Sequence, residues 1–280
     1  MSEAGPAGQL SLPLARCASL AGLRDALHAE WTKLRTVTGP AWLLIATVAA
    51  TVAISAAATA AVRCPSGTAC PVDPAKLSLT GIQVGQAVVA VLAVLVISGE
   101  YSTGMIRTTL AAMPHRVTVL GAKAAILTGL VLAAGTVAVL GSVLTGRAIL
   151  PGHGFTAARG FPALSLADGP VLRAAAGSVL YLALIALLSL GTATAVREPA
   201  VAIGIVFGLL YLAPTVAPLL NQHWHRHLEQ LSPTTAGLTI QATTGLRSLP
   251  ISPWGGLGVL AAWAAAALLA GGLVLRLRDA

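Results

Sequence analysis

Charged residues are scarce in this sequence. They make up 9% of its 280 residues, and 56% of the residues are hydrophobic. An average soluble protein carries about 25% charged residues, and without them it would expose large apolar patches and aggregate. The mean hydropathy of +0.84 agrees with this composition. The scarcity of charge therefore excludes a soluble globular protein and indicates an integral membrane protein.

Acidic residues are especially few, with 9 Asp and Glu in the whole chain. No Asp falls inside a long apolar segment, and Glu100 stands alone at the end of one. An intramembrane enzyme needs paired carboxylates, a nucleophile with a base, or metal ligands at membrane depth. The sequence has no such set and no His-Glu-x-x-His helix, which argues against catalysis by this chain.

Lysine is also rare, and none of the three lysines is followed by Ser or Thr. The phosphate-binding loop of an ATPase requires that pair. The three dipeptides are Lys33-Leu34, Lys76-Leu77 and Lys123-Ala124. We therefore expect no ATP site and no cofactor in this chain, so any ATP and Mg²⁺ that drive it are bound by another polypeptide.

The formal net charge of +8 has a simple explanation in a membrane protein. The basic residues are scattered at the ends of apolar segments, and no basic stripe alternates with aromatic residues. This pattern is typical of residues that orient a chain in a membrane, and it argues against a nucleic-acid partner.

Six apolar segments are long enough to cross a bilayer as helices, at about 20 residues each. The sequence thus predicts an all-α integral membrane protein with a single transmembrane domain over residues 1–280, without an internal repeat. The predicted spans cover residues 41–62, 82–98, 119–144, 174–196, 201–220 and 254–275.

Lys and Arg are denser on the side of the chain termini, where the connections between spans are short. Since such residues favour the cytoplasmic side, we expect a multi-pass protein of the cell membrane with both termini in the cytoplasm. The outer connections, residues 63–81, 145–173 and 221–253, are long and rich in Pro and Gly, as irregular loops are. The short turn Arg197-Glu198-Pro199 predicts that the fourth and fifth spans are antiparallel neighbours.

The cysteines differ in their expected environment. Cys64 and Cys70 fall in the first outer connection, where the oxidising side favours a disulfide between such close residues. Cys17 precedes the first span on the reducing side, and we expect it to be a free thiol.

An amphipathic segment precedes the first span, at residues 20–35. Its apolar residues recur at spacings of three and four and share one helical face, formed by Leu20, Leu23, Leu27, Trp31 and Leu34. Such a helix should lie flat in the inner membrane interface, in contact with lipid. Two interpretations stay open: a simple surface anchor, or an elbow helix that braces the transmembrane domain.

A second amphipathic segment follows the second span, at residues 99–116. Thr103 can cap a short helix, Ile106, Leu110 and Met113 share its apolar face, and Pro114 ends it. Arg107 adds one basic side chain. This shape suits insertion into a groove of a soluble partner, although an ordinary amphipathic loop has the same pattern.

Glu100 lies at the inner end of the second span, where the negative end of the helix dipole opposes a carboxylate. It therefore needs a partner, and Arg107, Arg116 and Lys123 are the candidates. The pair is either a salt bridge that orients the helix or a charge switch that changes partner during transport.

Other polar residues leave alternatives open. Gln83 and Gln86 either line an exit route or form hydrogen bonds between helices. His223, His225 and His227 alternate around Trp224; without a nearby carboxylate or cysteine they favour an interfacial belt over a metal site, so we expect no bound metal.

The sequence resembles the type-2 ABC transporter permeases, the membrane subunits of bacterial exporters. The segments that carry the resemblance are Glu30-Trp-Thr-Lys-Leu-Arg35, Gly99-Glu-Tyr101, Gly104-Met-Ile-Arg-Thr-Thr-Leu110 with Pro114, Arg116 and Lys123, and Leu275-Arg-Leu-Arg-Asp-Ala280. Members of the family often have Gly-Thr where this chain has Gly104-Met105.

The resemblance implies a function for the segment after the second span. It would contain a coupling helix that docks on a cytoplasmic ATP-binding subunit through Thr103, Met105, Ile106, Arg107 and Leu110. Tyr101 and Pro114 would set the angles at which the chain enters and leaves this helix. Two permeases, identical or different, would form the substrate route of an exporter.

Two other functions compete with this interpretation. A secondary transporter should carry ionisable residues or broken helices near the bilayer midplane, and the spans show no clear charge there. A non-transporting immunity or assembly protein would need no ATPase at all.

Overall fold

The computed structural model describes residues 38–64, 70, 72–102, 116–161, 163–216 and 221–277. This part of the chain is helical and contains no strand. The predicted interfacial helix at residues 20–35, with Leu23, Leu27, Trp31 and Leu34, lies outside the described residues.

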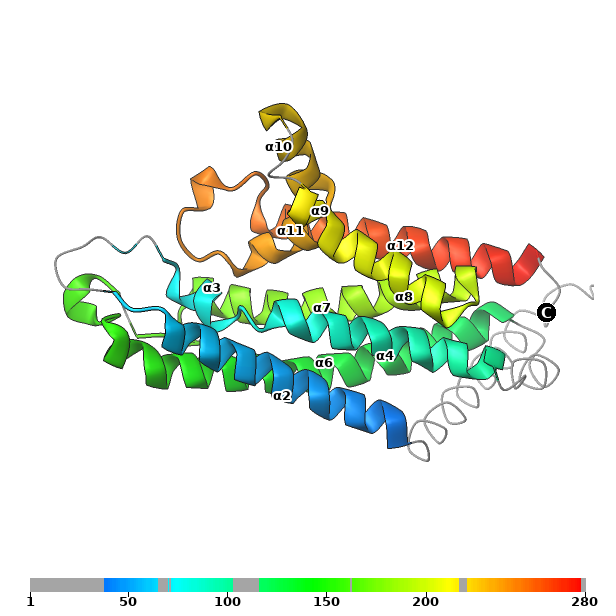
Figure 1. Ribbon diagram of the computed structural model, residues 1–280, viewed down its shortest axis with the longest axis horizontal. Coiled ribbons are helices and arrows are strands. Elements are labelled where there is room, and N and C mark those ends of the chain that lie inside the picture. Colours follow the sequence, from blue (N-terminus) through cyan, green and yellow to red (C-terminus); the bar gives the residue numbers. More distant parts are fainter. Residues whose placement is uncertain are drawn as a thin grey trace, which may run out of the picture.

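Six segments are long and apolar enough to cross a membrane, which confirms the predicted all-α, six-span protein. The spans run back and forth along the long axis of the molecule (Figure 1). Five of them are single helices: α2 (Thr38–Ala61), α4 (Ile82–Ser102), α6 (Arg116–Ile149), α7 (Gly169–Val196) and α12 (Pro253–Leu277). The fifth span is composed of α8 (Pro199–Phe207), the π-helical turn η3 (Gly208–Leu212) and α9 (Ala213–Val216).

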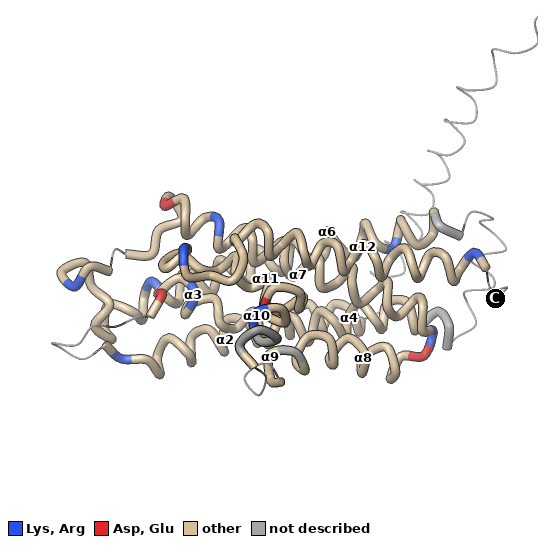
Figure 2. The backbone as a smooth tube through the Cα atoms, turned by 90° about the horizontal axis from the view of Figure 1, so that it is seen from above, with Lys and Arg blue, Asp and Glu red and all other residues tan. Residues whose placement is uncertain are grey.

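Several helices extend beyond the predicted spans. α6 continues to Ile149 and α7 begins at Gly169, whereas hydropathy alone placed these ends at residues 144 and 174. The added turns include Arg147 and Arg173. Hydropathy predicts the end of a span at such charged residues, although the helix extends past both of them. Figure 2 shows charged residues gathered toward the two ends of the bundle and around α10, with uncharged helix between.

α7 forms the centre of the bundle. It packs against α4, α6, α8 and α12, and most of its side chains are buried, including Tyr181, Leu182 and Ile185. Its last residue is followed by Arg197, whose φ of 66° places it in the left-handed region and ends the helix. The Glu198 carboxylate accepts hydrogen bonds from the N–H groups of Ala200 and Val201 and caps α8. α7 and α8 pack together as antiparallel neighbours, as predicted.

α2 packs on the bundle through small polar residues. Thr47, Thr51, Ser55 and Thr59 recur every fourth residue and are all buried. The Ser55 hydroxyl accepts a hydrogen bond of 3.0 Å from the N–H of Gly81, just before α4. Trp42, by contrast, is 69% exposed on the outer face of α2. This arrangement is typical of membrane helices, because lipid competes for apolar surfaces but small residues allow close approach.

The fifth span departs from α-helical geometry before Pro214. A proline has no N–H to donate and its ring would clash with the carbonyl of Leu210, four residues earlier. The π-helical turn at Gly208–Leu212 lies at this point. Pro218, the second proline of the predicted span, lies outside the described residues.

The outer connection at residues 221–253 is more ordered than its composition suggested. It contains α10 (Gln222–Leu231), α11 (Pro233–Leu238) and two short 3₁₀ helices, η5 (Thr239–Gln241) and η6 (Leu246–Ser248). Figure 1 shows α10 standing away from the bundle, with α11 between it and α7. The expectation of an irregular loop was therefore wrong for this connection. α11, η5 and η6 have three to six residues each, too few to show an apolar periodicity, whereas α10 has ten.

α11 and η5 are buried against α7 and α12 with the help of glycines. A Cβ atom added to Gly237 would lie 2.6 Å from the ring of Tyr181, and one on Gly177 would lie 2.0 Å from Ile240. A Cβ on Gly256 would lie 1.9 Å from the carbonyl oxygen of Ala236. At Gly256 the backbones themselves approach closely, and at Gly177 and Gly237 a side chain of the neighbouring element takes the space that a Cβ atom would need.

Replacing Gly256 by Ala should destabilise the protein by about 1–3 kcal/mol, because the new methyl group overlaps backbone atoms of α11. Gly258→Ala is the matched control, since no atom lies within 4 Å of its added Cβ on the same helix. Thermal unfolding of both variants in one detergent measures the difference. Equal midpoints for the two variants would contradict the packing of α11 on α12.

Candidate functional site

α4 ends and α6 begins at the same end of the bundle, here named the inner end because the sequence predicts that it faces the cytoplasm. Glu100 and Tyr101 lie in the last turn of α4, but their side-chain positions are outside the described part of the structure. Thr103, Met105, Ile106, Arg107, Leu110 and Pro114 all lie outside the described residues. The predicted coupling helix and charge switch therefore stay predictions.

Lys123 is the one predicted partner of Glu100 whose side chain is described. It lies in α6, two turns after Arg116, and is only 3% exposed. A buried ammonium group requires compensation by a partner or by polar atoms. Lys123 is thus held inside the bundle, about two turns from the start of α6.

The outer end of the bundle carries a small cap separate from the main core. Cys64 and Cys70 form a disulfide with 6.0 Å between their Cα atoms. Cys64 is also held by its backbone: its N–H donates to the carbonyl of His153 at 2.9 Å, and its carbonyl accepts from Arg159 at 2.8 Å. His153 and Arg159 end the 3₁₀ helices η1 (Leu150–His153) and η2 (Ala157–Arg159).

An apolar cluster fills this outer cap. Cys64, Leu150, Phe155 and Leu164 are buried there, and the rings of Phe155 and Phe161 meet edge to face at 5.1 Å between centroids. We use "outer cap" for these residues together with Cys70 and helix α3 (Pro74–Ser78). The cap joins the first and second outer connections.

Asp73 joins the outer cap to the third outer connection. Its carboxylate caps α3 by accepting from the N–H groups of Ala75 and Lys76. It also accepts from the N–H groups of Thr243 at 2.6 Å and Thr244 at 3.0 Å, and from the Thr243 hydroxyl at 2.7 Å. One side chain thus ties together segments 170 residues apart in the chain.

The charge of Asp73 is stabilised by these contacts. Burial by itself raises the pKa of Asp73, but the hydrogen bonds from Thr243, Thr244 and Lys76 outweigh it and hold the pKa below its ordinary value. Asp73 is therefore a carboxylate at neutral pH. Sequence reasoning missed this role, although Asp73-Pro74 is a recognisable start of a helix.

The buried polar side chains of the spans form hydrogen bonds between elements. The Tyr181 hydroxyl of α7 donates to the side-chain oxygen of Gln86 in α4. The Tyr211 hydroxyl of the π-helical turn donates to the carbonyl of Gln83 at 2.7 Å. Of the two roles considered for Gln86, the structure therefore supports the hydrogen bond between helices. The Gln83 side chain is exposed.

Two further hydrogen bonds hold η5 and the residue after it against α7. Gln241 donates to the Ser178 hydroxyl at 3.1 Å, and Arg173 donates to the carbonyl of Ala242 at 2.6 Å. These residues give no local sequence signal, because their partners are distant in the chain.

The structure describes the side chain of one of the three histidines of α10. His227 is exposed, and the side chains of His223, Trp224 and His225 are outside the described part. Among the residues described, no group of three His, Cys, Asp or Glu side chains could hold a metal ion.

Comparison with known proteins adds no relative. No protein-family model and no curated protein sequence matches this chain. Inference about its function therefore rests on its own residues and geometry.

Replacing Asp73 by Asn should destabilise the outer end by about 1–3 kcal/mol, because at least one N–H group loses its charged acceptor. Asp168→Asn is the control, since Asp168 precedes α7 without a side-chain capping bond. Thermal unfolding in detergent measures both variants.

The destabilisation caused by Asp73→Asn should also depend on pH. Because the pKa of Asp73 is lowered by folding, its ionised form stabilises the folded protein fully above a pH of about 3.9, the ordinary pKa of an aspartate. This stabilisation is lost as the pH falls through the lower pKa of Asp73 in the folded protein. The difference between wild type and Asp73→Asn should therefore be constant from neutral pH to about pH 5 and shrink below pH 4. A difference that grows on acidification would contradict the assignment.

Proposed function

We propose that this chain is the membrane-spanning permease subunit of an ATP-driven exporter of the type-2 ABC class. The observation that carries the proposal is the location of residues 103–115, which connect α4 to α6 at one end of a six-span bundle. In the sequence this segment has the apolar face and basic residue of a helix that docks on a soluble partner. It is the segment that resembles the coupling helix of that family.

An external source of energy follows from the absence of an ATP site. None of the three lysines is followed by Ser or Thr, so the chain lacks the phosphate-binding sequence of an ATPase. A separate cytoplasmic subunit would therefore bind and hydrolyse ATP.

The orientation is supported by the disulfide. Cys64 and Cys70 follow the outer end of α2, whereas residues 103–115 follow the opposite end of α4. Disulfides persist on the oxidising side of the membrane. Residues 103–115 and the C-terminal end of α12 would then face the cytoplasm.

The contacts of α4 suggest how the closure of an ATPase would be transmitted to the membrane-spanning helices. α4 leads directly into the docking segment, and at its outer half it is bonded to three other spans. These are the bonds of Gly81 to Ser55 of α2, Gln86 to Tyr181 of α7, and Gln83 to Tyr211 of the fifth span. A push on the inner end of α4 would tilt these spans together as a rigid body.

Two permeases facing each other would enclose the route between them, with an ATPase beneath each. The apolar spans suit an amphipathic or lipid-like substrate. The partner permease is either a second copy of this chain or a related chain.

Full-length protein extracted in mild detergent should copurify with a soluble ATPase. Ile106→Asp and Leu110→Asp should each weaken that complex by about 100-fold, since an unpaired carboxylate in an apolar groove costs at least about 3 kcal/mol. Thr108→Asp is the control, because residue 108 falls on the opposite face of the expected helix. Retention of the ATPase by all three variants would reject the docking helix.

The competing functions give different results in reconstituted vesicles. Transport of cargo by the purified chain without an ATPase, driven by an ion gradient, would establish a secondary transporter. A chain that never copurifies with an ATPase and moves no cargo would fit the immunity or assembly protein.

The orientation has its own test. In a Cys17→Ser background, a membrane-impermeant maleimide should label Thr108→Cys in inside-out vesicles but not in intact cells. Arg247→Cys, in the exposed outer helix η6, should show the opposite pattern. Labelling of Thr108→Cys in intact cells would end the proposal.

A further inference from the structure

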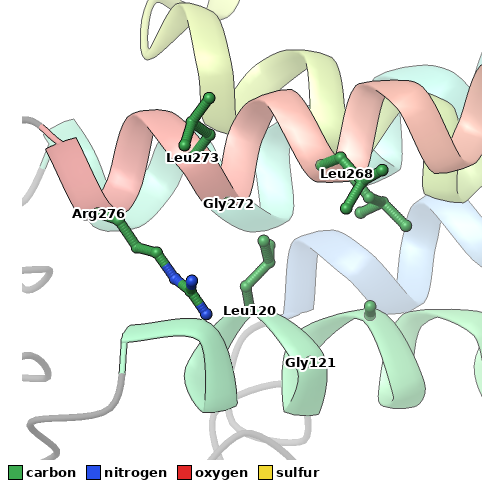
Figure 3. Close-up of a pocket in the computed structure, with 8 residues that line it drawn as sticks. Leu120, Gly121, Leu268, Gly272, Leu273 and Arg276 are labelled. Atoms are coloured by element: carbon green, nitrogen blue, oxygen red, sulfur yellow. The ribbon is translucent and has the colours of Figure 1, made fainter.

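An apolar groove runs between α6 and α12 at the inner end of the bundle. Its volume is about 370 Å³, within the range of roughly 300–1,000 Å³ typical of small-molecule sites. Figure 3 shows the two helices as its walls. The walls consist of Leu120, Gly121 and Ala124 from α6 and Leu268, Leu269, Gly272 and Leu273 from α12.

The groove exists because two glycines leave its walls without side chains. An added Cβ at Gly121 would meet no atom within 4 Å, and one at Gly272 would meet only the Leu120 side chain at 3.9 Å. The protein thus has room for larger residues at both positions and does not fill it.

The surroundings of the groove require an apolar occupant. Both walls are membrane-spanning helices, and Leu273 and the neighbouring Leu269 are 55% and 75% exposed on the side facing lipid. Water would find almost no hydrogen-bond partner there, and an empty groove would forfeit dispersion contacts on its walls. Acyl chains of the bilayer are the apolar groups available at this depth.

One charged residue closes the inner end of the groove. Arg276, in the last turn of α12, extends toward the first turns of α6 near Leu120 (Figure 3). It follows an apolar helix long enough to cross the membrane, so its guanidinium group lies at the depth of the lipid headgroups. A guanidinium group matches the geometry of a phosphate through two parallel hydrogen bonds.

We propose that this groove is a binding site for one anionic phospholipid of the leaflet that surrounds this end of the bundle. Its acyl chain lies between α6 and α12 against Gly121 and Gly272, and its phosphate binds Arg276. A free phosphate ion would satisfy Arg276 but leave the apolar walls uncovered, which is why the occupant is a lipid. Basic pockets between helices on the cytoplasmic side suit anionic headgroups.

The binding site is independent of the proposed transport function. It requires only that α6 and α12 cross the membrane and that Arg276 meets a headgroup, and it is measured without an ATPase. A lipid in this groove would nevertheless affect the proposed transport function, because of where the groove lies. Leu120 and Gly121 belong to the first turns of α6, directly after the proposed docking segment, so a bound lipid would brace the helix that receives the push.

Phosphatidylglycerol with a photoreactive group on its acyl chain tests the site. The purified full-length protein is reconstituted in nanodiscs of phosphatidylcholine that contain this probe, and labelled peptides are mapped by mass spectrometry. Labelling should concentrate on the walls of the groove, around residues 120–124 and 268–273. Uniform labelling of all lipid-facing spans would overturn the proposal.

Variants that fill the groove should abolish this labelling. Gly121→Leu and Gly272→Leu place a side chain where the acyl chain would lie, and the open space at both positions lets the protein fold. Gly129→Leu and Gly258→Leu are controls on the same two helices, also with no atom within 4 Å of the added Cβ. Thermal unfolding verifies that each variant is folded. Equal labelling in the filled and control variants would reject the site.

Arg276→Gln separates the headgroup contact from the groove. It should reduce the preference for phosphatidylglycerol over phosphatidylcholine by about fivefold, as expected for one basic residue at an anionic surface, while acyl-chain labelling of the walls persists. An unchanged preference would reject the phosphate contact. A crosslink from the groove to residues 1–37 in place of lipid would show that the chain fills its own groove, which would also overturn the proposal.

Discussion

The structure depends on one constraint: inside a bilayer no water is present to satisfy polar groups, and lipid tails are as apolar as Leu. Burial of apolar side chains therefore gives no advantage over contact with lipid. The helices associate instead through small residues and through hydrogen bonds between helices. Thr51 and Ser55 of α2 pack on Gly81 and Gly85, while Trp42 faces outward. In α2 the buried residues are small and polar, whereas the large Trp42 lies outside, the reverse of a helix in a soluble protein.

The same constraint makes the two ends of the bundle different. The outer end is held by a disulfide, by the Asp73 carboxylate and by α11, which is packed against α7 and α12 through glycines. At the inner end, α6 and α12 separate around an open groove, and α7 and α8 are joined by a two-residue turn. In the proposed exporter, a push at the inner end would tilt such a bundle while its outer contacts persist.

The sequence predicted those features that depend on length, hydropathy and short-range chemistry. The six spans follow from hydropathy, and the antiparallel α7 and α8 follow from the short turn at Arg197-Glu198-Pro199. α11 and η5 escaped prediction, because their burial depends on Gly177 and Gly256 in other helices. Asp73 escaped as well, since its partners Thr243 and Thr244 are 170 residues away. Contacts of this kind leave no periodic signal in either segment.

The π-helical turn in the fifth span contains one residue more than an α-helical turn of the same rise. That extra residue represents a stored rotation of about 100°, the angle between successive residues in an α-helix. Relaxation of Gly208–Leu212 to regular geometry would turn Ala213–Val216 about the helix axis by this amount and detach the Tyr211 hydroxyl from the Gln83 carbonyl. Such a rotation would leave the inner end of the span, which Glu198 caps, in place.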